Sequence, residues 1–379
     1  MSTLYRFGLV LLLAAFTQSA AADWHRFRGP DGSGIASGTI PTEYSATRHL
    51  AWRVPLPGKG VSSPIIDGDR VYVTAYTGYG LDLEDPGSLD ELVRHLLAFD
   101  RETGEELWRV SVVATGDEDP YQGFITQHGY ASSTPVTDGE HVFALLGKSG
   151  LIAVDRDGKE LWRRDLGQKS DPARWGDASS PILVDDVLVV NAGVLGHRVA
   201  GFDKTTGEPL WTVEDTGFTN SWSTPAVYRN GDAVQVLVHV PRRVMGIEPL
   251  SGDVLWSAAS PIDDATSPSI VVHDHVAYLM GSRAGHAMAV RLDGRGDVST
   301  THVVWKHSTR AGITTPVVAN GALYWASSGI FRAVSLATGK EIYKARLPRL
   351  GGPTGGFPNV DYSSPIVVGD HIVQFTRNG

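Results

Sequence analysis

A repeating unit runs through almost the whole chain and constrains its fold more than any other feature. A pair of hydroxyl residues followed by proline recurs, with the prolines at Pro64, Pro135, Pro181, Pro225, Pro268, Pro316 and Pro365. Successive prolines are 71, 46, 44, 43, 48 and 49 residues apart. Each proline begins an apolar run, a Gly/Asp/Asn turn and a second apolar run, which is the pattern of a β-hairpin.

A second element follows the first in most units and ends on an aromatic residue. It reads LLAFDRETGEELW up to Trp108, LIAVDRDGKELW up to Trp162 and VAGFDKTTGEPLW up to Trp211. In its turn, the Asp side chain can accept hydrogen bonds from backbone N–H groups two residues on, and Gly supplies a positive φ. Each unit therefore predicts two hairpins, or four short antiparallel strands.

Units of this length, with four strands and a closing tryptophan, are typical of β-propeller blades. A lone four-stranded sheet exposes two apolar faces, and radial stacking covers both. We therefore expect an all-β fold, a β-propeller of four-stranded antiparallel blades, over residues 51–379. The tryptophans that should dock the blades onto one another are Trp52, Trp108, Trp162, Trp211, Trp256 and Trp305.

The N-terminal residues 1–22 have the composition of an export signal. Arg6 is followed by the ten apolar residues 7–16 and then by small residues up to Ala22, which predicts cleavage near Ala22. The alternative is a retained membrane anchor, but ten apolar residues are about half of what spans a bilayer. We expect a periplasmic or secreted protein, with residues 23–50 forming an N-terminal arm.

The composition excludes several classes of protein. The chain has no cysteine, which rules out disulfides, thiolate zinc sites and lipid attachment at a cysteine. Its formal net charge of −9 disfavours a nucleic-acid partner, which a basic surface would recognise. The mature chain is therefore expected to be neither a lipoprotein nor membrane-spanning.

Two motifs carry a resemblance to a known family. The repeated A-x-D-x-x-T-G-x-x-L-W element resembles the tryptophan-docking motif of PQQ-like (quinoprotein alcohol dehydrogenase-like) β-propellers. The segment WHRFRGPDGSG at residues 24–34 resembles the F-R-G-P opening of exported PQQ-like repeat proteins. The likeness covers residues 24–379 and extends distantly to the BamB-type outer-membrane assembly factor. It implies eight blades, of which seven begin here, and we expect the C-terminus to be truncated.

Candidate ligand-binding residues precede the hydroxyl–Pro elements, because propeller ligands usually lie at one mouth of the central channel. They are His128, Tyr130, Trp175, Asp177, Asn220, Trp222, Asp264 and Asp361. The alternative is that these groups form hydrogen bonds with one another and with water in a polar channel. In the insertion at residues 114–127, we expect Asp117, Glu118 and Asp119 to form a solvated acidic loop rather than a Ca²⁺ site, since EF-hand spacing is absent.

These observations favour an exported, non-catalytic binding or scaffold module in the periplasm, with an unidentified protein or polymer partner. We predict no catalytic residue, no metal ligand and no cofactor. The alternative is a PQQ-dependent quinoprotein dehydrogenase that oxidises an alcohol or sugar, which would need PQQ with Ca²⁺ and an Asp base. The resemblance implies a vicinal disulfide beside the quinone in many such enzymes, and this chain has no cysteine. Carbohydrate or polymer binding through Trp175 and Trp222 is a third possibility.

Overall fold

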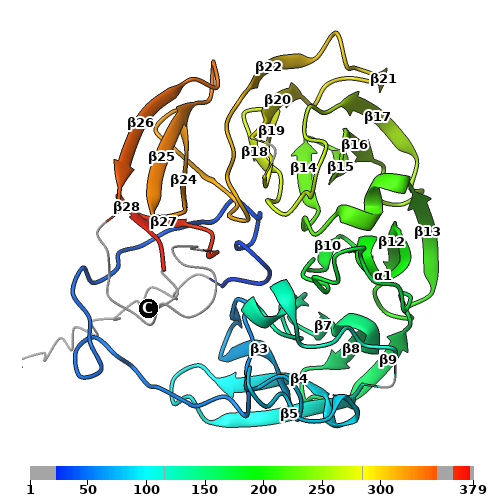
Figure 1. Cartoon of the computed structure of the whole chain (residues 1–379), viewed down its shortest axis with the longest axis vertical. Coiled ribbons are helices and arrows are strands. Elements are labelled where there is room, and N and C mark those ends of the chain that lie inside the picture. The colour runs from blue at the N-terminus through cyan, green and yellow to red at the C-terminus, as the bar shows by residue number, and fades with distance from the viewer. Residues whose placement is uncertain (1–22, 115, 284, 348–361, 376–379) are drawn as a thin grey trace, which may run out of the picture.

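A computed structural model describes residues 23–114, 116–283, 285–347 and 362–375. Within these ranges the strands form seven sheets, which are arranged as a ring around a central axis (Figure 1). The predicted all-β propeller fold is confirmed. The predicted signal peptide and Asp361 lie outside the described residues.

Six sheets each contain four antiparallel strands, and one of them gains a fifth strand. The first sheet consists of β2 (Ile65–Asp67), β3 (Arg70–Thr77), β4 (Val93–Asp100) and β5 (Glu106–Val113). The second consists of β6 (Val136–Thr137), β7 (His141–Leu145), β8 (Leu151–Asp155) and β9 (Glu160–Arg164). The third consists of β10 (Ile182–Val184), β11 (Val187–Ala192), β12 (Arg198–Asp203) and β13 (Pro209–Glu214). The fourth sheet consists of β14 (Ala226–Asn230), β15 (Ala233–Val240), β16 (Arg243–Ile247) and β17 (Val254–Ala259), with β21 (Gly296–Asp297) as its fifth strand. The fifth consists of β18 (Val271–His273), β19 (Val276–Met280), β20 (Ala287–Arg291) and β22 (Val303–His307). The sixth consists of β23 (Val317–Ala319), β24 (Ala322–Ser327), β25 (Ile330–Ser335) and β26 (Glu341–Arg346). We number these sheets as blades 1 to 6. In Figure 1, β10, β14 and β18 lie near the axis, whereas β5, β9, β13, β17, β22 and β26 form the perimeter.

The seventh sheet joins the two ends of the chain. Its described strands are β1 (Ile35–Ala36), β27 (Ile366–Val368) and β28 (His371–Val373), in that order. Strand β1 runs parallel to β27, with Ile35 opposite Val367. We refer to this sheet as blade 7.

Helical segments are short among the described residues. They are the 3₁₀ turns η1 (Leu89–Glu91), η2 (Gly123–Gln127), η3 (Gly147–Ser149) and η4 (Thr216–Asn220), and one α-helical turn, α1 (Gly193–Gly196). No described helix is long and apolar enough to cross a membrane.

The hydroxyl–Pro element links each blade to the next. A backbone N–H of one unit donates to a side-chain hydroxyl of the next unit, at 2.9–3.2 Å. The donor and acceptor residues are Ser63 and Thr134, Thr134 and Ser180, Ser180 and Thr224, Thr224 and Ser269, Ser269 and Thr315, and Thr315 and Ser364. In the fifth unit the acceptor is Ser269, which follows Pro268 rather than preceding it. The repeated hydroxyl therefore satisfies a buried N–H of the neighbouring blade, a group that would be costly to leave without a partner.

Tryptophan docking links the same blades at their perimeter. The indole N–H of Trp162 donates to the carbonyl of Lys204 in the next blade at 3.0 Å. A Cβ on Gly207 would lie 2.6 Å from the same ring, so glycine provides both a φ of +70° and room for the indole. Trp52, Trp108, Trp211 and Trp305 make the equivalent bonds to Arg101, Arg156, Pro249 and Leu336.

Trp256 departs from this pattern. Its indole N–H donates to Gln235 Oε1 in its own blade at 2.7 Å, and Gln235 Nε2 donates to the Leu292 carbonyl of blade 5 at 3.3 Å. Blade 5 lacks the Thr-Gly turn, and an amide side chain bridges the two blades instead.

The hydrophobic core lies between neighbouring blades. One buried cluster joins Phe143 and Leu145 of blade 2 to Leu188 and Val190 of blade 3. Further clusters fill the spaces between blades 1 and 2, 3 and 4, 4 and 5, and 5 and 6. Within blades 1 to 6, each sheet thus covers the apolar face of the next one.

Candidate functional site

A cavity of about 1000 Å³ lies where the segments leading into the innermost strands meet. All seven blades contribute to its described lining, with Ser63, Ser132, Ala178, Thr224, Ser269, Thr315 and Ser364. A volume of this size falls at the upper end of the range for small-molecule sites. We call it the central cavity.

Four aromatic side chains form a continuous series along the wall of the central cavity. The ring centroids of Trp222 and Trp175 are 5.2 Å apart, and those of Trp175 and Phe124 are 5.3 Å apart. Phe124 then meets Tyr362 at 5.6 Å. The Trp222 indole is fixed by its bond to the Gly176 carbonyl at 2.7 Å. The sequence predicted Trp175 and Trp222 at this mouth but missed Phe124, which lies in the insertion at residues 114–127.

His128 holds Trp175 in position. Its Nε2 lies 2.6 Å from the Trp175 carbonyl, and its Nδ1 lies 2.7 Å from Ser132 Oγ. Because a carbonyl only accepts, Nε2 carries the proton and Nδ1 accepts from the serine. Burial lowers the pKa of His128 to about 4, so the ring is neutral at pH 7. Both nitrogens are occupied, and His128 orients the aromatic wall.

Two other predicted site residues line a separate, smaller cavity of about 30 Å³. Tyr130 donates from its hydroxyl to the Asp119 carbonyl at 2.7 Å, and burial raises its pKa. Asp177 accepts from Ser133 Oγ at 3.2 Å, and burial raises the pKa of its carboxyl to about 7. A space of this size can hold water. These two residues therefore belong to a buried polar region beside the central cavity.

The acidic segment at Asp117, Glu118 and Asp119 differs from its prediction as a solvated loop. Glu118 and Asp119 are buried. Both Glu118 carboxylate oxygens accept from Arg94, at 2.7 and 2.8 Å. Asp119 lies 3.8 Å from Lys148 Nζ and accepts from Ser170 at 2.7 Å. The insertion is thus held against the blades by buried charge pairs.

The remaining predicted site residues do not line the central cavity, or they lie outside the described chain. Asn220 ends η4, and its carbonyl accepts from the Thr266 N–H at 3.0 Å. Asp264 accepts from the Arg283 N–H at 3.0 Å. Neither contributes to the described lining of the two cavities. Asp361 lies outside the described residues.

The N-terminal arm forms part of the wall of the central cavity through Trp24, Phe27 and Arg28. Trp24 exchanges backbone hydrogen bonds of 2.8 and 3.0 Å with Ile66 of blade 1. Arg28 donates to the carbonyls of Pro316, in the segment that leads into blade 6, and Pro365, in the segment that leads into blade 7, at 2.8 and 3.1 Å. The arm therefore connects the first blade with the last two, a role that the sequence did not reveal.

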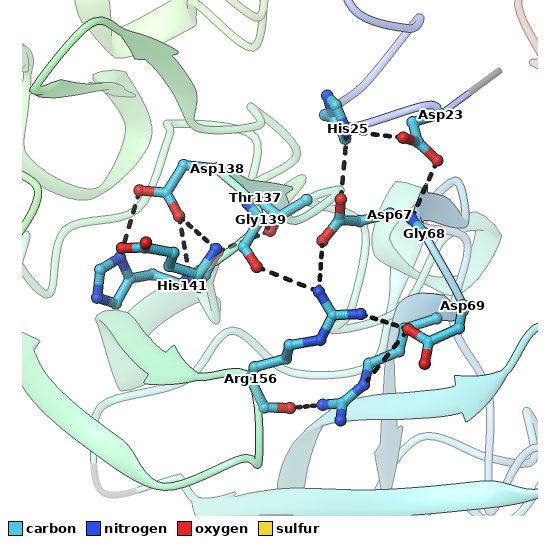
Figure 2. A network of polar contacts seen from close by, with 12 residues as sticks. Asp23, His25, Asp67, Gly68, Asp69, Thr137, Asp138, Gly139, His141 and Arg156 are labelled. Atoms are coloured by element: carbon cyan, nitrogen blue, oxygen red, sulfur yellow. Dashed lines mark hydrogen bonds and ion pairs between the residues drawn. The ribbon is translucent and has the colours of Figure 1, made fainter.

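One cluster of this arm has the residue types of a metal site. A nitrogen or oxygen of Asp23, His25 and Asp67 lies within 4.8 Å of each of the others. Figure 2 shows that both carboxylates already have partners. Asp23 accepts from the Gly68 N–H at 3.0 Å, and Asp67 lies 3.5 Å from Arg156 Nη1. These contacts support a role in anchoring the arm to blades 1 and 2.

The family follows from a match that covers most of the ring. A family model described as outer membrane protein assembly factor BamB matches residues 94–345. The chain belongs to this PQQ-like β-propeller family. Among the curated proteins, none matches.

Solved structures of two kinds share the fold of this PQQ-like propeller. BamB from Moraxella catarrhalis superposes with a TM-score of 0.52 and 14% identity, over 84% of this chain and 78% of that one. The quinohemoprotein alcohol dehydrogenase ADHIIG from Pseudomonas putida HK5 superposes with a TM-score of 0.52 and 11% identity, over 81% of this chain and 60% of that one. At such identities the likeness concerns the fold alone.

Replacing Asp177 with asparagine should change how stability depends on pH. The folded pKa of about 7 exceeds the ordinary value, so the protonated carboxyl stabilises the fold at low pH, and this contribution is lost as pH rises through 7. Asparagine stays neutral. From pH 5 to pH 8 the free energy of unfolding of the native protein should therefore fall by about 2 kcal/mol more than that of Asp177→Asn.

Urea denaturation of both proteins at the two pH values measures this difference. Neutral buried histidines such as His128 and His239 titrate in both proteins, so their effect cancels in the comparison. A difference that is the same at pH 5 and pH 8 would contradict a neutral Asp177 at low pH.

Proposed function

We propose that this chain is an exported, non-catalytic binding module that holds its ligand in the central cavity. The observation that carries the proposal is the aromatic series of Trp222, Trp175 and Phe124 along the wall of a cavity of about 1000 Å³. Ligand sites are typically concave and lined by aromatic side chains with a few fixed polar groups. Export rests on the composition of residues 1–22, and a periplasmic location on the family.

The polar groups near the cavity favour binding over catalysis. His128 uses both ring nitrogens to hold Trp175 and Ser132. Asp177 faces the smaller cavity. A general base must reach the proton that it removes, and neither residue offers a free atom to the central cavity. The site therefore presents surfaces and hydrogen-bond donors to a ligand.

The alternative of a PQQ-dependent dehydrogenase depends on the residues that line the cavity. Aromatic faces and arginines would suit a planar quinone that carries carboxylates. Ca²⁺ requires several oxygen ligands, usually carboxylates, and the described lining of the central cavity contains no Asp or Glu. The described lining of the cavity thus does not fit the pair of PQQ and Ca²⁺, and it contains no Asp base.

A titration with PQQ and Ca²⁺ separates the two functions. We expect the full chain to show no dye-linked oxidation of alcohols or sugars under these conditions. In parallel, oligosaccharides and peptides are titrated while tryptophan fluorescence is recorded. A ligand of the central cavity should bind saturably to the native protein and at least about tenfold more weakly to Trp175→Ala.

The matched control is Tyr343→Ala, because Tyr343 is an exposed aromatic residue on β26. It should leave the affinity unchanged. Turnover with PQQ would overturn the non-catalytic proposal. Binding that Trp175→Ala and Tyr343→Ala leave equally intact would place the ligand outside the cavity and would overturn the proposed site.

A further inference from the structure

The central cavity is positively charged in a protein that carries an excess of acidic residues. Its described lining contains Arg28, Arg283 and Arg310 and no Asp or Glu, whereas the whole chain has a formal net charge of −9. Clefts lined by one sign of charge concentrate ligands of the opposite sign. The cavity is therefore suited to an anion.

Arg28 is a buried cation that makes no ion pair among the described residues. Its side chain donates only to backbone carbonyls, those of Ser33, Thr315, Pro316 and Pro365, at 2.8–3.4 Å. Its Nε is buried without a hydrogen-bond partner, and the residue is 4% exposed. Burial lowers the pKa of Arg28 to about 10, and the Asp31 carboxylate offsets only part of that cost. A ligand anion in the cavity would add a further opposite charge to that of Asp31.

Arg283 and Arg310 are exposed at the same cavity. The guanidinium carbon of Arg283 lies 4.4 Å from the centroid of a Trp175 ring. Arg310 donates from Nη1 to the Arg283 carbonyl at 3.3 Å. The guanidinium therefore covers this face of Trp175, and a ligand that stacks there would turn the exposed Arg283 side chain toward its own acidic group.

The hydroxyls of the cavity are biased toward donation. Thr224, Ser269, Thr315 and Ser364 line it, and each already accepts a backbone N–H from the preceding blade. A hydroxyl that accepts keeps its own hydrogen to donate. Together with the arginines, these groups form a donor-rich lining that suits a ligand with many acceptor oxygens.

We propose that the central cavity binds an anionic oligosaccharide, whose sugar rings carry carboxylate or sulfate groups. The C–H face of a pyranose takes the place of the Arg283 guanidinium on Trp175, next to Trp222. The hydroxyl and ring oxygens of the sugar accept from the Ser and Thr hydroxyls, and its acidic group meets the displaced Arg283 and Arg310. This inference rests on the proposed binding function and names the ligand class. Neutral sugars would bring no opposite charge to the arginines.

Isothermal titration calorimetry of the full chain at low salt tests the proposal. The probes are trigalacturonic acid, a sulfated heparin disaccharide and neutral maltotriose. We expect one or both acidic probes to bind at least about tenfold more tightly than maltotriose. The acidic probe that binds identifies the charged group as carboxylate or sulfate. The affinity should fall as salt is added, because salt screens exposed charges.

A double variant locates the site. Arg283→Gln with Arg310→Gln should weaken the acidic probe about tenfold or more and leave circular dichroism unchanged. The matched control is Arg163→Gln, which alters an arginine paired with Glu160 on β9 at the perimeter. Arg28 is left unchanged because its bonds hold the arm.

Three outcomes would overturn the proposal. They are equal affinity for acidic and neutral probes, no binding of either acidic probe, and binding that the double variant leaves intact. A different ligand that binds and is lost in Trp175→Ala would preserve the proposed binding function while rejecting the anionic oligosaccharide. Turnover with PQQ would reject the binding function itself.

Discussion

Replacing Arg94 with methionine should lower the free energy of unfolding by about 3–5 kcal/mol. Arg94 donates to both oxygens of Glu118, and the two side chains are 3% and 4% exposed. Removing the guanidinium leaves a buried carboxylate without its cation. It also removes the bonds from Arg94 to the Tyr130 carbonyl and Ser149 Oγ. Urea denaturation measures the loss.

A surface pair provides the matched control for Arg94→Met. Arg109 lies 2.6 Å from Glu106 on β5, and both side chains are 34% exposed. Arg109→Met should cost no more than about 1 kcal/mol, because solvent screens an exposed pair. Adding Glu118→Gln to Arg94→Met should recover part of the loss, since the buried charge is then gone. Equal losses in Arg94→Met and Arg109→Met would contradict the importance of the buried pair.

Replacing Gly207 with alanine should break the tryptophan docking between blades 2 and 3. The new Cβ would lie 2.6 Å from the Trp162 ring, and the backbone φ of +70° is unfavourable for alanine. The left-handed conformation costs about 1–2 kcal/mol, and overpacking a buried ring adds about 1–3 kcal/mol. We expect a total loss of about 2–5 kcal/mol in the free energy of unfolding.

Gly321 separates the two contributions. Its φ is +74°, and no atom lies within 4 Å of the position of a Cβ. Gly321→Ala should therefore show only the backbone cost of about 1–2 kcal/mol. The difference between the two variants isolates the contact with Trp162. If both variants lose the same stability, the docked ring does not depend on the glycine.

The repeat made the propeller predictable, because each structural role has a local sequence signature. Asp100 accepts from the N–H groups of Glu102 and Thr103, and Gly104 follows with a positive φ. This is the turn that the Asp-x-x-Thr-Gly spacing predicts. The role of the hydroxyl directly before proline was harder to predict, since its partner is a backbone N–H of another blade, as in the bond from Thr134 to Ser180.

Long-range contacts account for what the sequence did not reveal. Glu118 looks like a surface residue until Arg94 approaches it from β4. Strand β1 has only two residues, and its partner β27 lies near the other end of the chain. Phe124 carries no motif that marks it as a site residue. Local patterns give no information about such pairings, which join residues that are separated in the sequence.

The same limit applies to the candidate site. Trp175 and Trp222 were predictable because they precede hydroxyl–Pro elements, and they line the central cavity. Asp177 precedes the same kind of element but lines the smaller cavity. The spacing fixes which loops meet at the axis, whereas the direction of each side chain depends on its packing.

A crystal structure of the full chain with trigalacturonic acid, or with the acidic probe that binds most tightly, tests the central claim most directly. We expect a sugar ring stacked on Trp175 or Trp222, with an acidic group within hydrogen-bond distance of Arg283 or Arg310. A sugar bound at the perimeter of the ring, with the central cavity empty, would contradict the account.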